Sequence, residues 1–180
     1  MQGKNPMDIA KEVADHVLEV AYPHLDKFRR RVRNAKYVGL DEPLAALYAI
    51  RKIITELDKV TTAIRQIYGV DVYSVIEPIF VDQEKGSFMV GYSWVIGGMK
   101  RVVAIITLNI YAPELSFVSV GVRGLDGSVY RYAIAPFTGE EHEQVLSPEQ
   151  VRRFAEGGFG GGGGEGKGED RKRRRRGKRT

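Results

Sequence analysis

The chain has 180 residues, of which 43% are hydrophobic, and its 28 Lys/Arg against 23 Asp/Glu give a formal net charge of +5. It contains no cysteine, which excludes disulfides, thiolate catalysis and cysteine metal sites. No stretch approaches the roughly 18 apolar residues of a membrane span, and residues 1–10 lack the basic and apolar regions of a secretory signal. The sequence therefore predicts a cytoplasmic protein, and its abundant Val, Ile, Arg and Glu suit a thermophile.

The first half of the chain is predicted to be helical. Apolar residues recur every three or four positions over 8–22, with Asp8 placed as the cap, and again over 23–38, where a proline would open a second helix. The longest helix is expected over 41–68, because it begins at an aspartate and carries a proline in its first turn. A further short helical turn is expected over 71–76.

The apolar spacing of the 41–68 helix alternates between three and four across three heptads. A coiled-coil seam requires this pattern, but a helix in a globular core gives almost the same one. Leu47, Ile54 and Thr61 widen the stripe beyond a pure seam, so we expect this helix to be buried in the core. A homodimer through this helix or through a sheet edge is the alternative.

The second half is predicted to form strands. Apolar stretches separated by turns that contain Gly, Pro or Asp cover 79–81, 87–96, 101–111, 115–122 and 128–135. Because short turns join successive strands, the neighbours should be antiparallel. The expected fold class is α+β, with three to four N-terminal helices packed on a four- to five-stranded antiparallel meander sheet. A last short helix is expected over 147–154.

The positive charge is concentrated at the C-terminus. Residues 157–180 contain ten glycines and nine Lys/Arg against three acids, a net of +6, whereas residues 1–156 carry 19 basic and 20 acidic side chains, a net of −1. Such a glycine-rich, like-charged segment cannot build a core, so it predicts a disordered tail behind a single domain over 1–156. The tail is best explained as an arm for a polyanion, above all nucleic acid, bound by Arg171, Arg173, Arg174, Arg175 and Arg176. The alternatives are a solubilising tail, or one that contacts an acidic protein or an anionic membrane surface.

A second basic zone covers residues 27–36, where no acidic residue interrupts the cations. Arg29, Arg33 and Lys36 share one face of the expected helix, with Arg30 beside them. One interpretation is a solvated face paired to neighbouring acids, and the other is a phosphate-binding face, which is supported by the absence of acids because a merely solvated face usually mixes signs. These four residues are therefore candidate phosphate ligands.

Aromatic residues gather on the expected strands. Tyr92 and Trp94 share one face of their strand, and Tyr111 and Phe117 lie opposite the aliphatic stripes of theirs. Beside Arg131, such rings could stack unpaired bases, at about 1–3 kcal/mol per base. The alternative is that most of these rings pack in the core.

The sequence gives little sign of an enzyme. His16, His24 and His142 are scattered, and none has the spacing of a metal ligand. A polar cluster near one strand end faintly resembles metal-dependent nuclease carboxylates, but a hairpin loop explains it better: Glu77, Asp82, Glu84 and Lys85. We therefore expect no catalytic residue, no metal and no cofactor.

Helices followed by an antiparallel meander with aromatic strands, in a cysteine-free chain of thermophilic character, resemble the ThermoDBP family of archaeal single-stranded DNA-binding proteins. The resemblance covers roughly residues 8–136 and depends on element order and on the stretches 87–95 and 101–111. It implies a dimeric assembly and a compact domain whose cleft, lined by aromatic and basic residues, grips single strands without sequence preference. The basic tail lies outside the resemblance.

Together these features predict a non-enzymatic protein that binds single-stranded nucleic acid, DNA in the first place, without sequence preference. Basic residues would contact phosphates and sheet aromatics would stack bases. Two alternatives stay open: an RNA-binding or ribosome-associated factor, and a dimeric protein-interaction module with a solubilising tail.

Overall fold

The computed structural model describes residues 4–34, 41–69 and 71–153. Its elements in chain order are α1 (Pro6–Arg33), α2 (Asp41–Tyr68), β1 (Val72–Ile76), β2 (Phe80–Asp82), β3 (Ser87–Ile96), β4 (Met99–Asn109), η1 (Pro113–Leu115), β5 (Phe117–Arg123), β6 (Val129–Ala135) and β7 (Glu140–Leu146). A short helix follows over 148–153, where one is expected. The basic tail and Lys36 lie outside the described residues.

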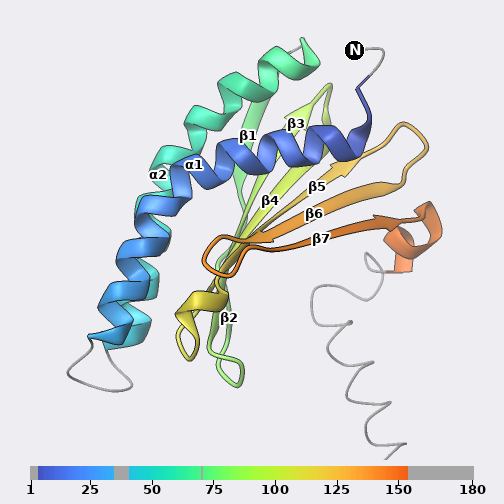
Figure 1. The fold of residues 1–180 in the computed structure, drawn as a ribbon. Helices are drawn as coiled ribbons and strands as arrows, with labels where there is room; N and C mark the ends of the chain where they lie inside the picture. The colour runs from blue at the N-terminus through green and yellow to red at the C-terminus, as the bar shows by residue number, and fades with distance from the viewer. Residues whose placement is uncertain (1–3, 35–40, 70, 154–180) are drawn as a thin grey trace, which may run out of the picture.

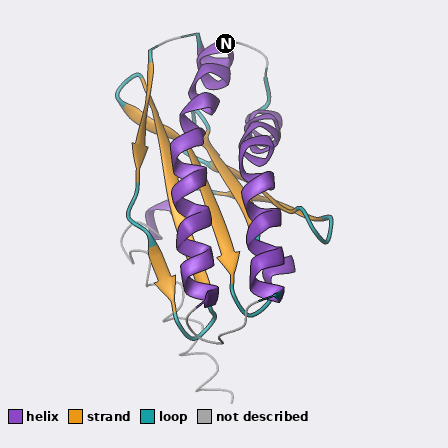
Figure 2. Cartoon of the chain, turned by 90° about the vertical axis from the view of Figure 1, so that its left-hand side faces the viewer, coloured by secondary structure: helices purple, strands orange, loops and turns teal. Residues whose placement is uncertain are grey.

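Two long helices cover one face of an antiparallel sheet (Figure 2). Within the described residues the sheet has seven strands: six in the order β1-β3-β4-β5-β6-β7, and β2, which pairs with β3 on the same side as β1 but beyond its end. Helix α1 packs on β4, β5 and β6, and α2 packs on β1 and β3. The α+β class is therefore confirmed, with fewer helices and more strands than the sequence predicts.

The core lies between the helices and the sheet. On the sheet it consists of the helix-facing residues of three central strands, which include the aliphatic stripes of β4 and β5: Val90, Val102, Ala104, Ile106, Leu108, Val118, Val120 and Val122. The apolar face of α2 forms the helix side of this core, as expected for a core helix: Ala46, Ile50, Ile53, Leu57, Val60, Ile64 and Ile67. The opposite face of the sheet has no helix over it in the part of the chain that the structure describes.

Helix α1 is continuous where the sequence predicts two helices meeting at Pro23. Proline inside a helix costs about 3 kcal/mol, because it lacks the N–H and its ring clashes with the preceding turn. Ala21, Leu25 and Phe28 are buried on either side of it, and each large apolar side chain buried stabilises by about 1.5–3 kcal/mol. Burial therefore outweighs the break, and the helix changes direction along its length instead of ending (Figure 1). The cap is Asn5 and not Asp8, because its side chain accepts a hydrogen bond from the Met7 N–H at 3.0 Å.

Two strands were missed. Residues 71–76 were expected to form a helical turn, but Val72–Ile76 is a strand that pairs with β3, from Val72 opposite Ile96 to Ile76 opposite Tyr92. Its Val, Tyr and Ile residues favour an extended chain. Strand β7 pairs with β6 along its whole length, yet most of its side chains are exposed and polar. It shows no alternation of apolar and polar residues, so nothing in its pattern predicts a strand.

No helix within the described ranges is long and apolar enough to cross a membrane.

Candidate nucleic-acid interface

The aromatic rings of β3 point into the core. Trp94 is fully buried and Tyr92 is 3% exposed, because both lie in the row of β3 that faces the helices. The Trp94 indole donates to Oγ1 of Thr61 at 3.0 Å, and the Tyr92 hydroxyl donates to Oγ of Ser74 at 3.0 Å. The prediction that these two rings stack on bases is therefore wrong.

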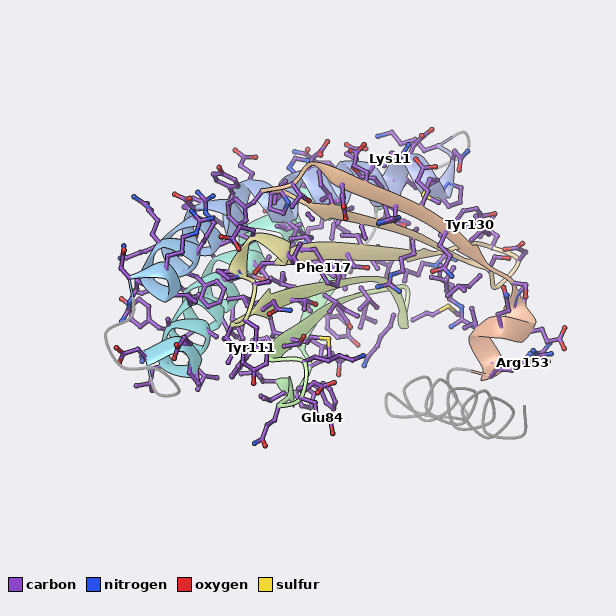
Figure 3. The ribbon with its side chains drawn as sticks, turned by 60° about the horizontal axis from the view of Figure 1, so that its bottom comes forward. Lys11, Glu84, Tyr111, Phe117, Tyr130 and Arg153 are labelled. Carbon is purple, nitrogen blue, oxygen red and sulfur yellow. The ribbon has the colours of Figure 1, made fainter. Side chains whose placement is uncertain are left out.

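Phe117 and Arg131 do lie on the uncovered face of the sheet, and Figure 3 labels Phe117 on its strand. They line a hollow of about 420 Å³ together with His142 and Glu140 of β7. The Arg131 guanidinium is half-buried and donates through Nε to Oγ of Ser119 at 2.7 Å. This hollow has apolar walls, but the Arg131 guanidinium already donates to Ser119, and Glu140 is also among the lining residues.

Tyr111 lies apart from that hollow. Its side chain is 69% exposed, and its hydroxyl donates to the carbonyl of Gln83 at 3.2 Å, which places the ring near the turn that carries Glu84 (Figure 3). A Cβ at Gly86 would come within 2.6 Å of the ring, so the ring lies directly on that glycine. The structure therefore does not bring Tyr111 into one site with Phe117 and Arg131.

The arginines expected to bind phosphate are mostly paired with acids. Arg29 and Arg30 both contact Asp26, at 2.7 and 3.0 Å, and Arg33 forms an ion pair with Glu114. The Arg29 guanidinium also lies 4.3 Å from the ring centroid of Phe137. The interpretation of a polar face paired to neighbouring acids is therefore the better one for these three arginines. Lys36 and the arginines of the tail lie outside the described residues.

Other cations of the same segment line a groove between the two helices, which run side by side in Figure 2. This interhelical groove encloses about 270 Å³ and consists of His24, Lys27, Phe28 and Arg31 of α1 with Ala45, Tyr48, Ala49, Lys52 and Glu56 of α2. On α1 the polar members recur at spacings of three and four, and on α2 at spacings of four, so each set lies along one side of its helix. The antiparallel packing of α1 against α2 brings the two sets together.

Small side chains make the groove hollow. Ala45 and Ala49 are 3% and 4% exposed, and Phe28 opposite them is 1% exposed. Because an alanine extends only a methyl group, the two helices leave room above Phe28 that a larger residue would fill. The longer polar side chains stand around this apolar floor.

An exposed aromatic ring lies at one end of the groove between two cations. Tyr48 is 43% exposed, and the charged groups of Arg31 and Lys52 each lie 5.5 Å from its ring centroid. Neither of them, nor Lys27, forms an ion pair with any described residue. An aromatic face flanked by unpaired cations can stack a planar base while the cations contact phosphate.

The end of the groove away from Tyr48 holds His24 and Glu56, which contact each other. His24 Nε2 and Glu56 Oε2 are 3.0 Å apart, and this hydrogen bond lowers the pKa of Glu56, with smaller contributions from the charges of Lys59 and Lys52. Glu56 also lines a second hollow of about 320 Å³ with His16 and Lys59, so the groove continues along the helix pair. An anionic ligand would therefore bind at the Tyr48 end and not beside Glu56.

None of the α2 residues that line this groove is among the candidates predicted from the sequence. The available signal was the spacing of Tyr48, Lys52 and Glu56 on the side of α2 away from its apolar stripe. Only the packing of α1 against α2 shows that this side of α2 lies next to Lys27 and Arg31 of α1.

The carboxylates that faintly resemble a nuclease site have ordinary roles. Glu77 accepts from Lys100 at 2.5 Å and from Ser93 at 3.1 Å, and Asp82 accepts from the backbone N–H of Lys85 at 3.2 Å. Within the described residues there is no group of three or more His, Asp or Glu that could hold a metal ion.

Comparison of the chain with models of protein families, with curated proteins and with solved structures found no match. The resemblance to the ThermoDBP family stays a prediction from the sequence.

Proposed function

We propose that this protein is a non-enzymatic nucleic-acid-binding protein that prefers single strands and has little sequence preference. Its contact surfaces would be the Tyr48 end of the interhelical groove and the basic segment 157–180. The observation that carries the proposal is the exposed Tyr48 ring with Arg31 and Lys52 at 5.5 Å and Lys27 in the same groove, none of which forms an ion pair within the described residues.

The preference for single strands follows from the ring. In a duplex the base faces are already stacked on each other, so a side-chain ring can reach them only in an unpaired strand. The groove offers no row of hydrogen-bonding groups long enough to distinguish bases. Binding through one ring and several cations would therefore tolerate any sequence.

The basic segment would supply most of the salt-dependent affinity. It carries nine of the 28 Lys/Arg of the chain, while residues 1–156 have a net charge of −1. Cations that neutralise phosphates release counterions, so the logarithm of the binding constant falls with the logarithm of the salt concentration by about 0.7 per phosphate contacted on a single strand. Removal of these cations should lower both the affinity and this slope.

Fluorescence anisotropy with labelled single-stranded DNA, duplex DNA and RNA of one length tests the proposal. Tyr48→Leu should weaken single-strand binding by about fivefold or more, the loss expected for one stacked base. Tyr73→Leu is the matched control, because Tyr73 is also an exposed tyrosine, 59% exposed, but lies on β1. Equal binding of both variants, or full-length protein that binds no oligonucleotide in dilute salt, would refute the proposal.

The basic segment is tested separately by replacing Arg173, Arg174, Arg175 and Arg176 with Gln in the full chain. We expect a smaller salt slope and an unchanged preference for single strands. An unchanged slope would remove this segment from the interface, while leaving the groove to be judged by the Tyr48 variant.

A protein-interaction module is the second candidate, because apolar side chains are exposed at the β1–β2 side of the sheet. Ile76, Ile79, Phe80 and Val81 are each more than 40% exposed there, and contiguous apolar surface of this kind marks association sites. Sedimentation equilibrium distinguishes this candidate, since it predicts a dimer that Phe80→Ser dissociates.

A further inference from the structure

A further hollow lies at the end of the sheet where β3 and β4 are joined. It measures about 550 Å³ and takes residues from α1, α2, β4, β5 and β6. We call it the sheet-end hollow and define it by Lys4, Ile9, Tyr68, Arg101, Arg123 and Tyr130. The start of α1, the end of α2 and the β5–β6 turn lie together at this end of the molecule (Figure 1). None of the groove residues contributes to it.

The walls of the sheet-end hollow are apolar. Ile9, Ile67 and Val122 are buried side chains that line it, and Leu125 beside it is 93% exposed. The Tyr130 ring forms a further wall and lies close to Gly124, where a Cβ would be 3.0 Å from a ring carbon. The hollow can therefore accept an apolar body.

Its polar groups are mostly cationic. Arg101 and Arg123 form no ion pair with any described residue, whereas Lys4 is paired with Glu12 at 2.8 Å. Asp126 also lines the hollow, but both its carboxylate oxygens accept hydrogen bonds from Ser128, at 3.0 and 2.9 Å. Helix α1 begins at Pro6, another lining residue, so the partial positive charge of its N-terminus adds to that of the arginines.

A hydroxyl group in the same wall lacks a hydrogen-bond partner. The Tyr68 oxygen is buried and makes no hydrogen bond within the described structure. Burial raises the pKa of this hydroxyl, and the charge of Arg101 partly opposes that rise, so the guanidinium and the hydroxyl act on one another. Buried polar groups are nearly always satisfied, and an orphaned donor next to a cation is the arrangement an anionic ligand completes.

We propose that the sheet-end hollow binds a small amphiphilic anion, a carboxylate or phosphate group carried on an apolar body. The anionic group would contact Arg101, Arg123 and the Tyr68 hydroxyl. The apolar body would lie against Ile9, Ile67 and the Tyr130 ring. A bare inorganic anion would leave the apolar walls in contact with water, and an uncharged apolar molecule would leave the cations and the hydroxyl without a partner.

Titration of the full-length protein with 1-anilinonaphthalene-8-sulfonate, a fluorescent anion on an apolar ring system, tests this. We expect saturable fluorescence enhancement that Arg101→Met or Arg123→Met weakens by about tenfold or more, the loss of one charge-assisted hydrogen bond. Lys85→Met is the matched control, because Lys85 lies in the β2–β3 turn at the opposite end of the sheet. Unchanged affinity in both arginine variants, or no enhancement in the full-length protein, overturns the proposal.

Competitors then distinguish the anionic group. Octanoate and phenyl phosphate carry a carboxylate and a phosphate on an apolar body, and at least one of them should displace the dye. 1-Octanol and inorganic phosphate at the same concentration should not. Displacement by octanol as efficient as by octanoate would show that charge plays no part and would overturn the proposal.

Tyr68→Phe separates a ligand contact from a structural role. Removal of an unpaired buried hydroxyl should raise the thermal unfolding temperature of the free protein, because no hydrogen bond is lost. The same change should weaken dye binding, because the ligand loses a donor. A variant that binds the dye as tightly as the wild-type chain would remove Tyr68 from the site.

Discussion

The indole Nε1 of Trp94 on β3 donates a hydrogen bond to Oγ1 of Thr61 on α2, 3.0 Å away, and both side chains are buried. The Thr61 hydroxyl in turn donates to Oδ1 of Asp58 at 3.2 Å, and the same oxygen accepts from Ser74 on β1. This chain of hydrogen bonds therefore joins helix α2 to strands β3 and β1 across an otherwise apolar layer. A chain of this kind stabilises only while every member has its partner.

Thr61→Val should destabilise the protein, because the substitution keeps the shape of the side chain and leaves the buried Trp94 N–H unpaired. The expected loss is about 1–3 kcal/mol in the free energy of unfolding, measured by urea denaturation. Thr62→Val is the control, since Thr62 is exposed on the next position of the helix. Equal unfolding midpoints for the two variants would show that the hydrogen bond contributes nothing.

The single tryptophan also reports on where nucleic acid binds. Trp94 is fully buried under α2, so its emission should be blue-shifted and should not change in intensity when a homopolymeric oligonucleotide saturates the protein. Anisotropy of the labelled oligonucleotide confirms saturation in the same sample. Strong quenching at saturation would mean that the sheet layer opens on binding, against the interface proposed above.

The arginines of α1 should fall into two groups. Arg33 forms its ion pair with Glu114 at the surface, where such pairs contribute about 0–1 kcal/mol, so Arg33→Gln should change neither stability nor oligonucleotide affinity by much. Arg31→Gln removes an unpaired cation beside Tyr48 and should lower the affinity and the salt slope. Anisotropy titrations at several salt concentrations compare the two. A larger loss for the Arg33 variant would favour the face predicted from the sequence over the groove.

The stability of the protein should fall at alkaline pH through Tyr132. Burial, and then the hydrogen bond from its hydroxyl to Glu141, raise the pKa of Tyr132 well above its ordinary value of about 10. A group whose pKa is raised in the folded state stabilises fully below its unfolded pKa, and this contribution is lost as the pH rises past 10 toward the folded pKa.

Urea midpoints measured from pH 7 to 11 check this prediction. Tyr132→Phe is less stable at neutral pH because it lacks the hydrogen bond, but its stability should decline less steeply above pH 10. Parallel declines of the variant and the wild-type chain would show that another group controls the alkaline transition.

The parts of the fold that the sequence predicts well are those with strong periodicity. The apolar rows of α2, β4 and β5 have the expected spacing and occupy the expected faces, because a buried surface has to repeat with the period of its element. The secondary structure is predicted wrongly where a local sequence signal and tertiary packing favour different conformations. Pro23 is a local signal for a helix end, but the buried residues on both sides continue the helix. Strand β7 is built from residues that no periodicity marks, and it exists because β6 offers it a complete set of backbone partners.

The candidate site shows the same limit. A sequence indicates that Lys27 and Arg31 are exposed, and that Tyr48 and Lys52 lie off the apolar stripe of another helix. It does not indicate which faces of the two helices meet. Likewise, Trp94 could be placed on one side of its strand from alternation alone, but only the position of the helices decides that this side is buried.

The two edges of the sheet differ, and this difference limits how the sheets of two copies of the chain can pair edge to edge. Strand β7, at the edge of the sheet, carries the exposed residues Glu140, Glu141 and Glu143; Glu141 accepts from Tyr132 and Glu143 pairs with Lys11, but charged residues on an edge strand still disfavour pairing with a second strand. The β1–β2 edge carries no such row and exposes apolar side chains instead. A sheet with only one edge able to pair can form a symmetric dimer, but it has no second edge through which further copies could join. This chain should therefore resist growth of fibrils through its sheet edges even when it is concentrated.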